Sequence, residues 1–79
     1  MTKSEIQKNL TSAFHDVFDD EDIVLSSDLT AQDVQEWDSL AHVRLMLTVE
    51  REFKVKFSAA EIANLKNVGE LIDLIESKL

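Results

Sequence analysis

The chain has no cysteine, no proline and a single glycine, Gly69, among its 79 residues. Without cysteine it has no disulfide framework, no thiolate metal site and no thiol nucleophile of its own. Without proline or a glycine-rich stretch, collagen-like sequence, proline-rich linkers and glycine-rich phosphate loops are excluded. No apolar run approaches the roughly 18 residues of a membrane-spanning helix, and no signal-peptide pattern is present. We therefore expect a cytoplasmic domain with no insertion into a membrane.

Basic residues are also scarce, because 16 acids outnumber 8 bases and leave a net charge of −8. This charge argues against binding to nucleic acid or docking to an anionic membrane, and it favours a basic protein partner. A hydrophobic content of 44% is too high for a disordered chain, and residues 1–79 are expected to form one domain. A domain of this size buries only about 60–65% of its unfolded surface, which leaves little material for a deep enzymatic cleft. We do not expect an enzyme.

The first predicted helix ends near Phe18, where residues 19–22 supply four consecutive acids that oppose the helix dipole. Ser4 and Gln7 have the spacing of a capping box at its start. Five apolar residues recur on one face with a period of 3.6 residues: Ile6, Leu10, Phe14, Val17 and Phe18.

Residues 19–37 are predicted to form a long connection. The segment from Thr30 to Val34 is compatible with one helical turn, with Thr30 as its N-cap. A connection of this length in a small domain is uncommon and often functional. Four apolar residues without a sustained period are expected to fix it to the helices: Ile23, Val24, Leu25 and Leu29.

The second half of the chain is predicted to hold three more helices. One runs from Ser39 to Phe53 with Asp38 as N-cap, and residues 54–57 then form an extended link. Two further capping boxes, Ser58 with Glu61 and Asn67 with Glu70, open a short helix to about Leu65 and an amphipathic last helix. The predicted fold is all-α, a four-helix bundle with three longer helices, one short helix and a long first loop.

The helix over residues 39–53 has two apolar faces. At 100° per residue, one arc forms a core face, whereas Leu40, Val43 and Leu47 fall on the opposite side. A small bundle covers one such stripe, so we expect the second to be exposed and to bind partners. The alternative is that the connection 19–37 folds over it. The core arc consists of Leu45, Met46, Val49 and Phe53.

The segment Glu36-Trp37-Asp38-Ser39-Leu40 resembles the Asp-Ser-Leu signature of acyl carrier proteins. The signature stands at the start of the second of four predicted helices, in an acidic chain of about the right length. Residues 43–53, 57–62 and 68–72 also resemble the later helices of that family, so the resemblance covers essentially the whole chain.

This resemblance implies that Ser39 carries 4'-phosphopantetheine, attached by a phosphopantetheinyl transferase from coenzyme A, with Asp38 beside it. A helix N-terminus suits a phosphodiester, because it offers free N–H groups and a partial positive charge. The terminal thiol of the group would hold acyl, aminoacyl or polyketide intermediates, which accounts for the absence of cysteine. Capping alone is the alternative interpretation of Asp38 and Ser39, and the position of the pair and the length of the chain favour the carrier interpretation over it.

The resemblance also places a partner-binding surface on the second helix, with Asp38 and Glu36 adding to its acidic part. Fatty-acid carriers of the family have acids where this chain has Ala41, Arg44 and Arg51, which favours a specialised pathway over housekeeping fatty-acid synthesis. The Gly-Gly pair typical of peptidyl carriers before the serine is absent. The expected partners are the transferase and a ligase, acyltransferase or synthase, with the carrier a monomer. The predicted partner-binding residues are Leu40, Val43, Arg44, Leu47, Glu50 and Arg51.

Other interpretations remain open. The helices could form an interaction module without a prosthetic group, in which the apolar stripe binds a partner helix. A nucleophile pair of Ser39 with His42 lacks an orienting third group and an oxyanion hole. On the helical wheel His42 lies near the core arc, so it is expected at the rim of an acyl pocket or on a packed surface. His15 is expected to be solvated and Trp37 to anchor the end of the connection. The acids at 19–22 lack the spacing and glycine of a calcium loop, and no metal site is predicted.

Overall fold

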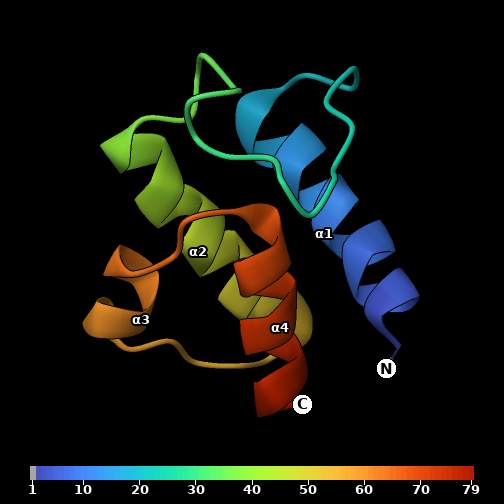
Figure 1. Cartoon of the computed structure of the whole chain (residues 1–79), viewed down its shortest axis with the longest axis vertical. Coiled ribbons are helices and arrows are strands. Elements are labelled where there is room, and N and C mark those ends of the chain that lie inside the picture. The colour runs from blue at the N-terminus through green and yellow to red at the C-terminus, as the bar shows by residue number, and fades with distance from the viewer. Residues whose placement is uncertain (1) are drawn as a thin grey trace.

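A computed structural model describes residues 2–79 and shows a bundle of four helices with no strand in that range (Figure 1). The connection 19–38 crosses one end of the bundle, and both ends of the chain lie toward the opposite end. The all-α fold predicted from the sequence is confirmed. No helix within residues 2–79 is long and apolar enough to cross a membrane. The helices are α1 (Lys3–Phe18), α2 (Ser39–Phe53), α3 (Ala59–Ala63) and α4 (Val68–Lys78).

The capping residue of α1 differs from the prediction. Thr2 is the N-cap: its hydroxyl accepts the N–H of Glu5 at 3.2 Å, and the Glu5 carboxylate accepts the N–H of Thr2 at 3.0 Å. Ser4 and Gln7 already lie within the helix, so the predicted box between them is wrong. Both pairs have the same spacing, but the helix already begins at the earlier one, because the N–H of Ile6 donates to the carbonyl oxygen of Thr2 at 3.0 Å.

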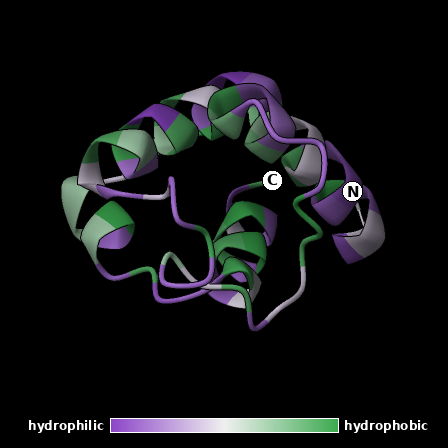
Figure 2. Cartoon of the chain, turned by 90° about the horizontal axis from the view of Figure 1, so that it is seen from above, coloured by the Kyte–Doolittle hydropathy of each residue, from purple (hydrophilic) through white to green (hydrophobic). Residues whose placement is uncertain are grey.

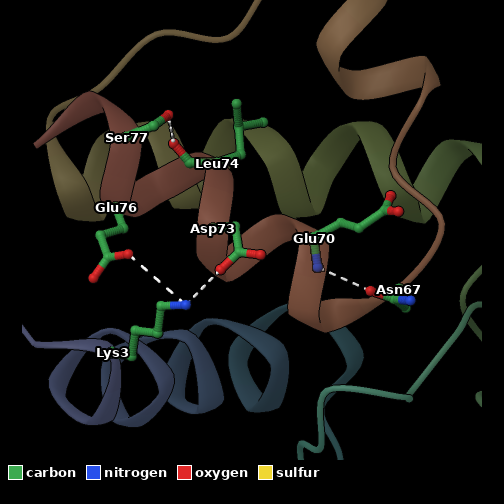
Figure 3. A network of polar contacts seen from close by, with 7 residues as sticks. All are labelled: Lys3, Asn67, Glu70, Asp73, Leu74, Glu76 and Ser77. Carbon is green, nitrogen blue, oxygen red and sulfur yellow. Dashed lines mark hydrogen bonds and ion pairs between the residues drawn. The ribbon is translucent and has the colours of Figure 1, made fainter.

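The predicted caps of the later helices are largely correct. Ser58 and Glu61 form a complete capping box, but α3 ends at Ala63 rather than near Leu65. Asn67 accepts the N–H of Glu70 at 2.8 Å (Figure 3). Only half of the second box forms, because the Glu70 carboxylate accepts the N–H of Lys66 instead of returning to Asn67.

The core lies between α1, α2 and α4. Figure 2 shows α4 as a mainly hydrophobic ribbon, and four of its residues are buried. Phe14 packs edge-on against Trp37, with ring centroids 5.1 Å apart, and Phe18 lies 6.1 Å from the same indole. This aromatic cluster anchors the end of the connection directly before α2, as predicted for Trp37. The fully buried residues of the three helices are Ile6, Leu10, Phe14, Leu45, Met46, Val49, Val68, Leu71 and Ile75.

The connection 19–38 is fixed at several points, although not by every apolar residue predicted. Leu25 is buried, but Val24 is 80% exposed, so the prediction is wrong for Val24, whose side chain points away from the bundle. The N–H of Gly69 donates to Ser27 at 3.0 Å, and a Cβ at position 69 would lie 3.1 Å from that same oxygen. The single glycine therefore lets the connection approach the start of α4.

Two further expectations for the connection need correction. Thr30 caps an isolated turn, with its N–H bonded to Asp33 at 3.0 Å, but no helix forms between Thr30 and Val34. His15 is half-buried rather than solvated, and its Nε2 lies 3.0 Å from the carbonyl oxygen of Ile23. The last turn of α1 therefore holds the connection that follows it.

The two ends of the chain are joined at the surface. The Lys3 ammonium lies 2.8 Å from Asp73 and 3.9 Å from Glu76 (Figure 3). The hydrogen bond to Asp73 raises the pKa of Lys3, and all three side chains are exposed. Exposed pairs contribute little to stability, so the apolar core holds α1 against α4.

Candidate functional site

Ser39 is the first residue of α2 and is exposed. Asp38 precedes it in an extended conformation and accepts the N–H of Ala41 at 2.8 Å, as predicted for the N-cap. Within residues 2–79, no acceptor is found for the N–H groups of Ser39 and Leu40. The start of α2, where Ser39 stands, therefore offers two free N–H donors and the positive end of the dipole of a 15-residue helix.

A depression of about 560 Å³ opens beside Ser39. The end of the connection, the first turns of α2, α3 and the start of α4 enclose it. Its volume lies within the range of about 300–1,000 Å³ found for small-molecule sites. Its lining combines polar groups with apolar side chains, which suits a group with a charged end and an apolar end. The lining includes Trp37, Ser39, His42, Val43, Ile62 and Leu71.

His42 bridges two walls of this depression. Its Nδ1 accepts the indole N–H of Trp37 at 3.0 Å, and its Nε2 lies 3.1 Å from the carbonyl oxygen of Ile62. An indole nitrogen only donates and a carbonyl only accepts, so both contacts require the neutral tautomer with hydrogen on Nε2. Both ring nitrogens are therefore engaged. Neither is free to take a proton from Ser39, which argues against a catalytic pair.

Replacing His42 with alanine is expected to loosen α3. The change removes the hydrogen bond to Ile62, and a net hydrogen bond of about 1 kcal/mol corresponds to roughly fivefold faster local opening. Hydrogen exchange of the amides in 59–65 measures this. Trp37→Phe is the matched control, because it removes the indole donor but keeps the contact between His42 and Ile62. Equal exchange of α3 in H42A and wild type would show that His42 does not hold this helix.

The helix α3 is the least buried wall of the depression, since none of its residues is fully buried. Its first turn is held by Glu61, whose carboxylate accepts the N–H of Ser58 at 2.8 Å and lies 3.1 Å from the Lys78 ammonium. The hydrogen bond from Ser58, followed by the contact with Lys78, lowers the pKa of Glu61. The charged form of Glu61 therefore stabilises the docked α3.

Acidification is expected to release α3 locally. A carboxyl whose pKa is lowered on folding adds stability above its unfolded value, here near 4.5, and this stability is lost as pH falls through the lower folded value. The opening free energy of α3, from hydrogen exchange corrected for intrinsic rates, should therefore fall below about pH 4.5. Glu61→Gln should abolish that dependence, whereas Glu52→Gln on α2 should retain it. A pH dependence that persists in E61Q would contradict the assignment to Glu61.

The second apolar face of α2 is exposed, as predicted. Leu40 is 72% exposed, Leu47 is 60% exposed and Val43 is 50% exposed, so the connection 19–38 does not cover them. Arg44 and Arg51 are exposed on the same side of the helix. These five residues form what we call the α2 ridge.

Glu50, the sixth residue predicted for partner binding, is placed differently. It is half-buried, and its carboxylate accepts the N–H of Phe57 at 2.7 Å. This contact fixes the link between α2 and α3, so the carboxylate of Glu50 is only partly available to a partner.

The sequence analysis did not identify the role of Ile62 and Lys78 around the site. Ile62 acts through its backbone carbonyl, which no residue type reveals. Lys78 reaches Glu61 from 17 positions away, and its ammonium also lies 5.9 Å from the centroid of the Phe57 ring. Within residues 2–79, no group of three His, Asp or Glu side chains converges in the arrangement of a metal site.

Comparison with known proteins gives three matches. A family model described as "Phosphopantetheine attachment site" matches residues 9–75, which include α2 and the depression. The chain is 35% identical over 81 positions to a protein named acyl carrier protein from Coprothermobacter proteolyticus, covering 100% of this chain and 96% of that protein. The solution structure of a holo acyl carrier protein from Geobacter metallireducens is similar with a TM-score of 0.86 at 44% identity. That match covers 91% of this chain and 83% of the other.

Proposed function

Because the chain belongs to the acyl carrier protein family, whose prosthetic group is a covalent 4'-phosphopantetheine, we propose that Ser39 is its attachment residue. In this proposal the protein is a carrier without catalytic activity of its own. When attached, the group supplies the thiol on which acyl cargo is held as a thioester. The protein presents that cargo to biosynthetic enzymes.

One observation carries the assignment to Ser39: this exposed residue is the first of α2 and also lines the depression. Ser39 is the one serine in the lining of that depression. Ser58 also stands at a helix start, but its hydroxyl accepts the N–H of Glu61 at 3.1 Å and caps a helix of five residues. Ser39 thus combines an accessible hydroxyl with a position at the start of a longer helix, which has the stronger dipole.

The residues around Ser39 suit the two ends of the group. The free N–H groups of Ser39 and Leu40 at the start of α2 would favour the negative charge of a phosphate attached to the serine. The apolar side chains of Val43, Ile62 and Leu71 line the depression and can shield an acyl chain from water. Trp37 and His42 join two walls of the depression through the hydrogen bonds described above.

We further propose a specialised pathway rather than housekeeping fatty-acid synthesis. The support is the pair Arg44 and Arg51, exposed on the α2 ridge, where the fatty-acid carriers of the family resembled have acids. The cargo enzyme is a ligase, acyltransferase or synthase, and a phosphopantetheinyl transferase attaches the group. A monomeric state and a cytoplasmic location stay predictions.

Mass spectrometry tests the assignment. The purified protein is incubated with coenzyme A and a broad-specificity phosphopantetheinyl transferase, and the intact mass is compared before and after. The expected result is the mass of one phosphopantetheinyl group, located by fragmentation to the peptide that contains Ser39. No adduct, or an adduct on another residue, would overturn the proposal. An unmodified protein that binds a partner helix through the α2 ridge would favour the interaction module.

A further inference from the structure

Charge is distributed unevenly on either side of Ser39. Residues 19–38 contain eight acids and no base, a net charge of −8, whereas residues 39–56 contain four bases and two acids, a net charge of +2. The charge of the whole chain, −8, therefore hides a local difference. The connection before the attachment serine is strongly acidic, whereas α2 itself has two arginines and two glutamates, a net charge of 0, and the two remaining bases, Lys54 and Lys56, follow the helix.

The arginines of the α2 ridge have no partner within residues 2–79. The ion pairs in that range involve Lys3 and Lys78, and neither Arg44 nor Arg51 takes part in one. Of the two acids of α2, Glu50 accepts the N–H of Phe57, and Glu52 takes part in no ion pair within residues 2–79. The two guanidinium groups are thus exposed and uncompensated on a helix with an exposed apolar stripe.

The arrangement of these side chains follows from the helix period. On the helical wheel, Arg44 and Arg51 lie within about 40° of Leu40, and Leu47 lies on the other side of Leu40. At a rise of about 1.5 Å per residue, Arg44 lies about 7.5 Å and Arg51 about 18 Å along the axis from Ser39. The ridge is therefore an apolar strip edged by two positive charges on one side.

From this arrangement we infer that the enzyme served by this carrier presents an apolar depression flanked by acidic side chains to the α2 ridge. This inference rests on the proposed function, since it names the partner of the same carrier. A basic surface suits the connection 19–38, but it would place like charges against Arg44 and Arg51. The partner's docking surface therefore has two signs, basic near the serine and acidic along α2.

A pair of designed peptides tests the sign of the docking surface. Both are amphipathic helices with the same leucine face, flanked by glutamates in one and by lysines in the other. Each is titrated into 15N-labelled protein at about 0.15 M salt. The Debye length is then about 8 Å, so the charge of the acidic connection is largely screened at Arg51. The glutamate peptide should shift the amides of residues 40–51, and the lysine peptide those of residues 19–38.

Charge reversal supplies the control. The double substitution Arg44→Glu and Arg51→Glu should lower the affinity for the glutamate peptide about threefold to tenfold, which is the contribution expected from two exposed ion pairs. Lys8→Glu with Lys56→Glu changes the net charge equally, from −8 to −12, and should leave its affinity unchanged. Both control lysines are exposed and lie outside the ridge.

Each other outcome would contradict the inference. A lysine peptide that binds residues 40–51 more tightly, or no shift with the glutamate peptide, would show that acids do not recognise the ridge. Shifts in 40–51 that depend on protein concentration alone would show that a second copy covers it. The Ser39 adduct is measured separately on the wild type, so its absence would refute the proposed function without deciding the sign of the ridge.

Discussion

Replacing Ser39 with alanine is expected to abolish the phosphopantetheine adduct completely. The hydroxyl oxygen is the atom that bonds to phosphorus, and no neighbouring side chain in the depression offers another serine hydroxyl. Incubation with the transferase and coenzyme A should leave the intact mass of S39A unchanged. Under the same conditions the wild type gains one group.

The S39A protein should remain folded, because Ser39 contributes little to the bundle. Its side chain is exposed, Asp38 still caps α2, and alanine is a better helix former than serine. The free energy of unfolding, measured by thermal unfolding followed by circular dichroism, should therefore change by no more than about 0.5 kcal/mol. A folded protein without the adduct separates loss of the attachment atom from loss of structure.

Ser58→Ala is the matched control for S39A. Ser58 stands at the other serine-bearing helix start, so its removal weakens the cap of α3 by about 1 kcal/mol. The adduct on Ser39 should nevertheless form in S58A. An unchanged adduct in S39A, or its loss in S58A, would assign the modification elsewhere.

The second large effect is expected at Phe14, whose replacement by alanine should remove a large part of the stability of the domain. Phe14 is 0% exposed, and its ring contacts Phe18 and Trp37 at centroid distances of 5.7 and 5.1 Å. A buried Phe→Ala change costs about 3–5 kcal/mol, whereas a domain of this length has about 4–12 kcal/mol in total. The cavity also removes the support of Trp37, so the end of the connection before Ser39 should loosen.

Urea denaturation measures this effect, with the fluorescence of Trp37 as a probe of the aromatic cluster. The shift of the urea midpoint equals the lost free energy of unfolding divided by the m-value. With an m-value of about 1 kcal/mol/M the midpoint should fall by about 3–5 M, or the protein should be unfolded without urea. Val24→Ala is the control, because Val24 is 80% exposed and its loss should change stability by less than about 0.5 kcal/mol. Similar midpoints for F14A and V24A would contradict the placement of Phe14 in the core.

Local signals predicted the helices well and the connection less well. Apolar periodicity located the core faces of α1, α2 and α4, and Asp38, Ser58 and Asn67 cap their helices as predicted. The predictions for Val24 and His15 were wrong because both depend on the path of the connection. Val24 lies in an irregular segment, which has no period from which to infer a face, and His15 of α1 is half-buried where the carbonyl of Ile23 reaches it.

The sequence by itself determined the charge, the absence of a thiol, the four helices and the position of an Asp-Ser-Leu segment at a helix start. These properties depend on residue type and on neighbours within a few positions. Only the tertiary structure decided how the Trp37, His42 and Ile62 groups join, how Lys78 reaches Glu61, and that Glu50 turns toward Phe57. Such contacts join separate elements and one uses a backbone carbonyl, so they exist only once the helices have packed. The absence of cysteine thus follows from the sequence alone, whereas the depression beside Ser39 exists only because the helices pack around it.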